Sequence, residues 1–204
     1  MAEKGKAEIT HGLSPQATEW LRYNITGDFS SKYDQLAKDA KEYGKVMDNE
    51  FKRPNERAEA AEKYRDVLLE VIKNLDSGIA ELKKLEGNFR LSFSGEAKEF
   101  AKYVANLEQT RANTVGMLWR QTEKALGEGT LTKITLPMPK GMDVEALERK
   151  YPAYRFEEVA INLESNEASI MITRPVRRDI DVVDFEGKVA PLKPKQRDIY
   201  TKFE

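Results

Sequence analysis

The sequence has no cysteine and a single histidine, and both shortages exclude whole classes of chemistry. Without cysteine the chain has no disulfides, thiolate metal sites or cysteine nucleophiles. The histidine, His11, lies in a polar N-terminal stretch, so a Ser-His catalytic pair or a histidine metal site lacks its parts. The patterns GxxxxGK[ST] and GxGxxG are also absent, and the stretch 127–130 lacks the lysine of a phosphate loop. We therefore expect a protein that is not an enzyme and that has no cofactor.

Long apolar runs and a net charge are missing as well. No apolar run approaches the roughly 18 residues of a membrane-spanning helix, and residues 1–10 have no signal-peptide core. We expect no membrane partner and a cytoplasmic location, or a place in the virion if a phage encodes the protein. The net charge of −1 gives no overall attraction to nucleic acid or to an anionic membrane.

What the sequence does contain is helical periodicity, centred on residues 55–126. Apolar residues recur there every three or four positions, as on one face of a helix. The stretch fits two long helices of equal length with a short connection, which favours an antiparallel hairpin. We expect the first helix to begin at the N-cap Asn55 and to stop at Gly87. The second is expected to begin at the N-cap Ser94 and to stop at the glycines of 127–129.

The apolar face of the second helix is interrupted in its middle by polar residues and glycine. The interrupting residues are Arg111, Thr114, Gly116 and Gln121. An interrupted seam with charged flanks leaves two possibilities open, packing within one chain and packing between two chains.

The connection between the two helices carries three apolar residues, Phe89, Leu91 and Phe93. They alternate with polar residues, which is the period of a strand rather than of a helix. The three side chains either pack onto a neighbouring element or are presented to a partner. We favour packing, because large apolar patches are seldom left exposed.

Two shorter helices are expected before the hairpin. Ser14 followed by proline predicts an N-cap and a first helical position. Ser31, three residues before an aspartate, resembles a capping box that opens a helix over 31–51. Residues 14–127 would then form a three-helix bundle, or a coiled-coil hairpin with a docked helix, and residues 1–13 a flexible N-terminus.

Beyond residue 129 the apolar period changes to strict alternation, which predicts strands. Strands are expected at 132–138, 154–163, 168–173 and 180–185. A short helix capped by Asp143 follows the first strand, and the second strand changes its apolar parity at Glu157 and Glu158, as a β-bulge would cause. The order β-α-β-β-β over 130–190 makes the chain an α+β protein. A charged tail, 191–204, contains Tyr200 and Phe203 as candidates for docking a partner.

Carboxylates on the first long helix offer one route to catalysis. Glu59, Glu62 and Asp66 have spacings that can place several carboxylates on one helix face, as a magnesium-dependent hydrolase requires. The simpler interpretation is a solvated face with an ion pair from Glu59 to Lys63. The second helix offers no matching pair of carboxylates. A divalent-metal-dependent hydrolase is therefore our second alternative.

Basic clusters near the C-terminus offer a route to nucleic-acid binding. The clusters consist of Arg174, Arg177 and Arg178, and of Lys193, Lys195 and Arg197 beside the two aromatic residues of the tail. Arginine beside aromatic residues suits phosphate contact and base stacking. Four acidic residues follow closely, between 179 and 186, and would repel a phosphate backbone. Nucleic-acid binding is therefore our first alternative rather than our preferred function.

The preferred interpretation is a non-enzymatic protein-protein interaction or assembly protein. We expect the long helices to mediate self-association into a homo-oligomer and the C-terminal unit to dock another protein. Small cysteine-free proteins with this division are common, as a class, among phage structural, assembly and host-takeover proteins.

Overall fold

The computed structural model describes residues 12–25, 29–139, 141–162, 167–175, 181–183 and 189–191. Within these ranges, residues 29–31, 160–162, 181–183 and 189–191 are described by their backbone alone. The chain divides into two compact units, Met1–Thr173 and Arg174–Glu204. Helices α1 to α5 and a three-stranded sheet belong to the first unit, and a two-stranded sheet belongs to the second. The α+β class predicted from the sequence is confirmed.

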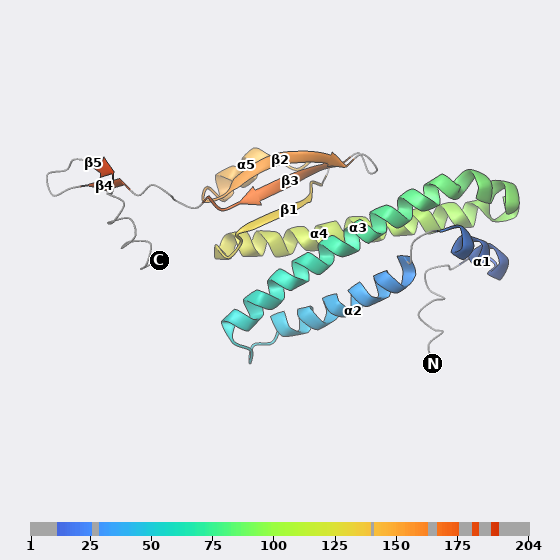
Figure 1. Ribbon diagram of the computed structural model, residues 1–204, viewed down its shortest axis with the longest axis horizontal. Helices are drawn as coiled ribbons and strands as arrows, with labels where there is room; N and C mark the ends of the chain where they lie inside the picture. Colours follow the sequence, from blue (N-terminus) through green and yellow to red (C-terminus); the bar gives the residue numbers. More distant parts are fainter. Residues whose placement is uncertain are drawn as a thin grey trace. The chain divides into compact units, whose positions relative to one another are not determined.

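Two long helices, α3 and α4, dominate the first unit and pair as the predicted hairpin (Figure 1). Helix α3 spans Pro54–Ser92, helix α4 spans Ala97–Glu128, and a 3-10 turn, η1, lies between them at Ser94–Glu96. Helix α4 ends at Gly129, whose φ of 69° is the left-handed conformation that glycine adopts without strain.

The start of α3 and the start of α4 differ from the sequence prediction. Helix α3 begins at Pro54, because proline fits the first helical position and needs no hydrogen-bond partner there. Asn55 therefore lies inside the helix, and Arg53 occupies the N-cap. Ser94 is the first residue of η1, and no side chain caps α4 by a hydrogen bond. Both predicted N-caps of the hairpin were wrong.

The end of α3 also differs from the prediction. The helix passes through Gly87 and continues to Ser92, so Phe89 and Leu91 lie on its last turns, Phe93 is its C-cap, and the three residues form no strand. A glycine inside a helix costs about 1 kcal/mol. The additional turns bury Phe89 completely, and burying a phenylalanine side chain contributes about 1.5–3 kcal/mol. Burial therefore outweighs the local stop signal.

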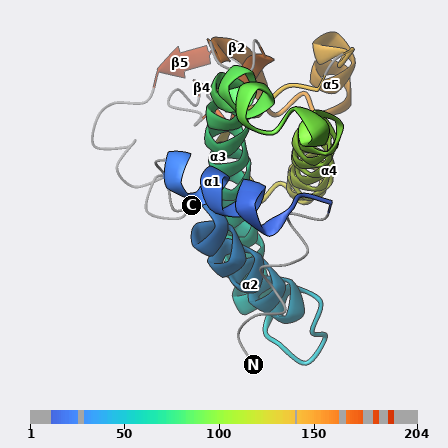
Figure 2. The same cartoon turned by 90° about the vertical axis from the view of Figure 1, so that its right-hand side faces the viewer.

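Helix α1, Pro15–Asn24, lies across the end of the hairpin (Figure 2). The predicted N-cap is confirmed, because Ser14 Oγ accepts a hydrogen bond from the backbone N–H of Ala17 at 3.2 Å. Ser14 also joins α1 to the connection of the hairpin. Its N–H and its hydroxyl each donate to a carboxylate oxygen of Glu96, both at 2.7 Å.

Helix α2 spans Phe29–Met47 and packs along α3 (Figure 1). It begins before Ser31, so the predicted capping box lies within the helix and does not open it. It also ends before Phe51, whose side chain is 99% exposed. The apolar period predicted this helix correctly, but without burial at Phe51 the last predicted turn has nothing to stabilise it.

The three-stranded sheet confirms the predicted strands and the predicted short helix. The elements are β1, Lys133–Pro137, α5, Val144–Lys150, β2, Arg155–Asn162, and β3, Glu167–Thr173. The sheet is antiparallel with the order β1-β3-β2, and its register shifts between Glu158 and Ala160, where the bulge was expected. Asp143 caps α5 by accepting from the N–H of Ala146 at 3.0 Å.

The second unit contains a short antiparallel hairpin. Strand β4, Asp181–Val183, lies within the strand predicted over 180–185, and it pairs with β5, Val189–Pro191, which the sequence did not predict. These strands form a sheet of their own and are not paired with β1 to β3. The boundary between the compact units lies after Thr173, whereas the sequence prediction grouped 130–190 together.

Two hydrophobic cores stabilise the first unit. The sheet core joins α3, α4 and α5 to the three strands, and its largest fully buried members are Ile72, Leu118, Leu136, Ile170 and Ile172. The hairpin core joins α1 to α3 and α4, with α2 packed against it, and its members are Ala17, Leu21, Val71, Leu75, Ile79, Leu82, Phe89, Phe100, Tyr103 and Leu107. The strands and the hairpin therefore fold around a shared interior, and the sheet does not have a separate core.

Two of the polar residues that interrupt the apolar face of α4 find their partners within the chain. Arg111 forms ion pairs with Asp76 of α3 and with Glu167 of β3, the latter at 2.7 Å. Thr114, which is buried, donates its hydroxyl to the backbone carbonyl of Thr110 at 2.8 Å. The seam around these residues lies inside the monomer, so it needs no second chain to cover it.

Candidate functional site

The apolar residues at the end of the hairpin divide into two buried or half-buried side chains and one exposed side chain. Phe89 stacks on Phe100 with ring centroids 4.4 Å apart, and Phe93 lies 5.2 Å from Phe89. Trp20 of α1 meets both Phe89 and Phe93 edge-on, at 5.8 and 6.0 Å. Leu91 points away from this cluster and is 87% exposed. Of the three apolar residues that were singled out in this connection, Leu91 is therefore the most exposed.

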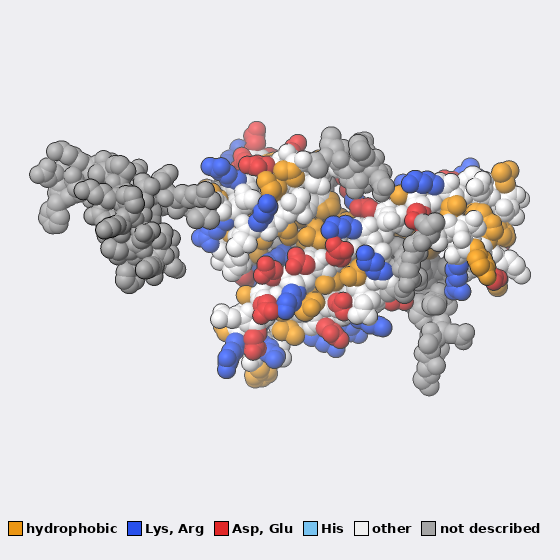
Figure 3. Space-filling view, in the orientation of Figure 1, with side chains coloured by type: hydrophobic (Ala, Val, Ile, Leu, Met, Phe, Trp, Pro, Cys, Tyr) orange, Lys and Arg blue, Asp and Glu red, His pale blue; other side chains and the backbone are white. Residues whose placement is uncertain are grey.

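The surface around Leu91 is poor in charge. We call it the tip surface and define it by its exposed residues, which are Gly87, Asn88, Arg90, Leu91, Ser92, Ser94 and Gly95. In a chain with 34% charged residues, this surface contains one charged residue, Arg90, which pairs with Glu86 at 2.6 Å. Hydrophobic side chains, in orange, gather at this end of the hairpin in Figure 3.

The carboxylates proposed for metal binding are not gathered into a site. Glu59 accepts a hydrogen bond from Lys63 at 2.6 Å, and this hydrogen bond lowers the pKa of the Glu59 carboxyl. Within the part of the chain that the structure describes, no group of three or more His, Cys, Asp or Glu residues could hold a metal ion. Glu59, Glu62 and Asp66 therefore lie along an exposed face of α3 without converging.

Most residues of the proposed basic clusters and of the tail lie outside the described residues. Arg174 is described and is exposed. The others are Arg177, Arg178, Lys193, Lys195, Arg197, Tyr200 and Phe203, so nucleic-acid binding through them stays a prediction. His11 and most of the N-terminal stretch 1–13 also lie outside the described ranges. None of the helices within those ranges has an apolar stretch of the length needed to traverse a bilayer.

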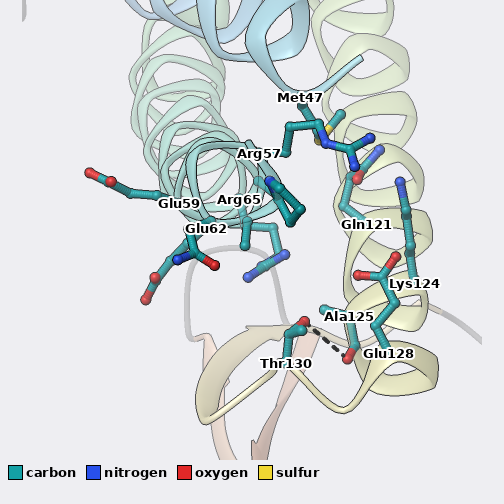
Figure 4. Close-up of a pocket in the computed structure, with 14 residues that line it drawn as sticks. Met47, Arg57, Glu59, Glu62, Arg65, Gln121, Lys124, Ala125, Glu128 and Thr130 are labelled. Atoms are coloured by element: carbon teal, nitrogen blue, oxygen red, sulfur yellow. Dashed lines mark hydrogen bonds between the residues drawn. The ribbon is translucent and has the colours of Figure 1, made fainter. Parts of the chain in front are cut away.

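A pocket that the sequence did not predict lies between α3 and α4, at the end of the hairpin opposite the tip surface. Its volume is about 690 Å³, and the first turns of α3, the last turns of α4, Met47 of α2 and Thr130 line it. We call it the α3–α4 pocket. Figure 4 shows Arg57, Arg65 and Gln121 directed into the space between the helices, while Glu59 points away from it.

Buried polar and charged groups line the α3–α4 pocket. Arg65 is only 7% exposed, and burial lowers the pKa of its guanidinium, although Glu62, Asp66 and Glu128 act in the opposite direction. Arg57 Nε and Gln121 Oε1 are buried and have no hydrogen-bond partner. The sequence contained a signal for this arrangement, because Arg65 and Gln121 occupy positions on the apolar faces of their helices.

Neither a protein-family model, nor a curated protein, nor a solved structure matches this chain.

Proposed function

We propose that this protein is a non-enzymatic protein-interaction protein that docks its partner through the tip surface of the α3–α4 hairpin. The observation that carries this proposal is Leu91, an aliphatic side chain left 87% exposed beside a cluster of packed aromatic rings. An exposed leucine alone is ordinary on a protein surface. Leu91 differs because packed aromatic rings hold its helix turn in place and because the residues around it carry little charge.

The support for Leu91 is rigid. Phe89, two residues earlier on the same helix, is fully buried, and the rings of Trp20, Phe93 and Phe100 surround it. The backbone at Leu91 is therefore held in place before any partner arrives. A preorganised anchor loses little conformational entropy on binding, which favours affinity.

The surroundings of Leu91 also suit a protein partner. Small polar residues and glycine flank it, and the nearby charge of Arg90 is already paired with Glu86. The centres of protein interfaces are depleted in charged residues, because burying an unpaired charge is costly. The partner surface we expect is an apolar pocket with an uncharged rim.

From the sequence we expected self-association through the long helices. Because the seam between α3 and α4 is buried within one chain, we now propose that self-association would use the tip surface instead. The apolar faces of α3 and α4 are covered by one another, by α1, by α2 and by the sheet. A second copy would therefore meet the tip surface. A phage structural, assembly or host-takeover protein, the class that the sequence favoured, would act through the same surface.

The test uses the full chain with a photo-crosslinking amino acid at position 91, in the cells that naturally contain the protein. Position 51 provides the matched control, because Phe51 is 99% exposed at the other end of α3 and has no ring contact among the described residues. We expect a discrete adduct at position 91 and none at position 51. The mass of the adduct distinguishes a different protein from a second copy of this 23.3 kDa chain.

A substitution completes the test. With the photo-crosslinking amino acid moved to the exposed position 88 of the tip surface, Leu91→Arg should abolish the adduct. It should change the free energy of unfolding by less than about 0.5 kcal/mol, since the Leu91 side chain is 87% exposed. Equal crosslinking at positions 91 and 51, or an undiminished complex with Leu91→Arg, would refute the tip surface as the docking site.

A further inference from the structure

We propose that the α3–α4 pocket binds a small organic phosphate, with the phosphate held by the guanidinium groups of Arg57 and Arg65. This site is separate from the tip surface. Arg65 and Leu91 are 26 residues apart on one helix, which corresponds to about 39 Å at 1.5 Å per residue. Ligand binding here and protein docking at the tip surface can therefore be tested independently.

The first argument is the unpaired charge of Arg65. The residue is only 7% exposed, and the carboxylates of Glu62, Asp66 and Glu128 attract its guanidinium without a hydrogen bond among the described residues. Burying a guanidinium in this way costs free energy unless an anion or a set of acceptors meets it. These three carboxylates are themselves exposed, so solvent screens their attraction. An anion inside the pocket would supply the missing partner.

The second argument is the set of buried atoms without a hydrogen-bond partner. Arg57 Nε–H needs an acceptor, and Gln121 Oε1 needs a donor. Buried polar groups are nearly always satisfied, so these two atoms, on residues that line one pocket, leave one acceptor and one donor to be supplied by a ligand or by water. A phosphate oxygen accepts from arginine, often through two parallel hydrogen bonds. A hydroxyl or amino group on the body of the same ligand would donate to Gln121.

The third argument is the size and the lining of the pocket. A volume of about 690 Å³ is within the range of small-molecule sites and far exceeds the volume of a bare phosphate ion. Apolar groups from Met47, Pro54, Ala58 and Ala61 line it beside the basic side chains. The pocket also lies at the N-terminus of α3, where the helix dipole favours a negative group. A phosphate attached to an apolar or aromatic body matches all of these features.

Phosphate is a better match than a single carboxylate because of the number of basic groups. Arg57, Arg65 and Lys124 all line the pocket. Three acidic residues line it as well. Glu59 is already hydrogen-bonded to Lys63 and points away (Figure 4), and Glu62 and Glu128 are exposed, so solvent screens their charge. A dianionic phosphate can use several cations at once, whereas one carboxylate is satisfied by a single arginine.

The experiment is calorimetric titration of the full chain with adenosine 5′-monophosphate, adenosine and inorganic phosphate at low ionic strength. We expect adenosine 5′-monophosphate to bind at least about tenfold more tightly than either of the other two compounds, since each supplies only part of the required contacts. Equal binding of adenosine would overturn the role of the anion. Equal binding of inorganic phosphate would overturn the organic body, and no binding of any probe would overturn the site.

Variants assign the binding to the pocket. Arg65→Met should weaken binding of adenosine 5′-monophosphate by at least about tenfold. It should not lower the thermal stability of the free protein, because the substitution removes a buried charge that has no hydrogen-bonded partner. Arg22→Met, the same change at an exposed position of α1, should alter neither quantity. Arg57→Met, at a half-buried position, provides a second variant if Arg65→Met does not fold. Unchanged binding in both pocket variants would refute the proposal.

Discussion

At the scale of single residues, Arg111 shows how a charged side chain can occupy the apolar face of a long helix. Its side chain is only 11% exposed, and it lies between Asp76 of α3 and Glu167 of β3. Burial lowers the pKa of Arg111, but hydrogen bonds to the two carboxylates act in the opposite direction, and the net pKa is raised. The ion pairs therefore hold two helices and a strand together at one point.

Removing Arg111 should be strongly destabilising. Arg111→Met leaves two partly buried carboxylates facing one another without their cation, and breaking a buried pair from one side costs about 3–5 kcal/mol. We expect a loss of about 3 kcal/mol in the free energy of unfolding, because Glu167 is partly exposed. Urea denaturation followed by circular dichroism measures this loss.

The matched control is Lys83→Met. Lys83 pairs with Glu108 at 2.7 Å and also joins α3 to α4, but both side chains are about half exposed. Exposed ion pairs contribute about 0–1 kcal/mol, so the control should change stability little. A loss in the control as large as that of Arg111→Met would show that the burial of the pair is not what matters.

The roles of Arg111 and Arg65 show where sequence reasoning reaches its limit at this scale. Both residues stand out in the sequence as charges on an apolar helix face. The sequence does not show what surrounds them. Glu167, a partner of Arg111, lies on a distant strand, and the pocket that Arg65 lines forms only where three helices meet. Periodicity locates such an interruption, but only the packing of non-local elements shows whether the charge is paired or free to bind.

At the scale of elements, the long helices and the main sheet were predictable and their ends were not. The three-four period of α3 and α4 and the alternation of β1 to β3 are each repeated over several turns or residues, so tertiary contacts reinforce the local pattern. Helix ends depend on one or two residues, and Gly87 was outweighed by the burial of Phe89. The three-residue strand β5 is too short to show a period.

Glycine substitutions test the corrected end of α3. Nothing lies within 4 Å of the position that a Cβ on Gly87 would occupy, and this residue is helical. Gly87→Ala should therefore raise the free energy of unfolding by about 0.5–1 kcal/mol. Had the helix stopped at Gly87 in a left-handed conformation, as the sequence suggested, the same substitution would be destabilising.

Gly129 provides the opposite case for comparison. Its φ of 69° lies in the left-handed region that alanine avoids, so Gly129→Ala should lower the free energy of unfolding by about 1 kcal/mol. Thermal denaturation of the two variants should therefore give shifts of opposite sign. Shifts of the same sign would place the end of one of the two helices elsewhere.

At the scale of the whole molecule, the described members of both hydrophobic cores all precede the second unit. Every residue of the sheet core and of the hairpin core, including the partly buried ones packed against them, lies between Leu13 and Ile172. The second compact unit begins after these residues, at Arg174. The stability of the first unit should therefore be contained within residues 1–173.

A truncated chain tests this statement. A protein of residues 1–173 should unfold within about 3 °C of the full chain, which corresponds to a difference of about 1 kcal/mol for this size. A chain that ends at residue 150 should not fold, because it lacks Phe156, Ile170 and Ile172 of the sheet core. If the 1–173 protein melted far below the full chain, the second unit would have to contribute to the stability of the first.

The separation of the interior into two cores has an optical consequence. The chain has two tryptophans, of which Trp119 belongs to the sheet core and Trp20 packs against the hairpin core. Indole emission shifts to longer wavelength when water reaches the ring, so each tryptophan is a built-in fluorophore for its own half of the interior. With phenylalanine in place of one of them, the remaining emission follows a single core, and the two spectra together tell whether the halves melt as one.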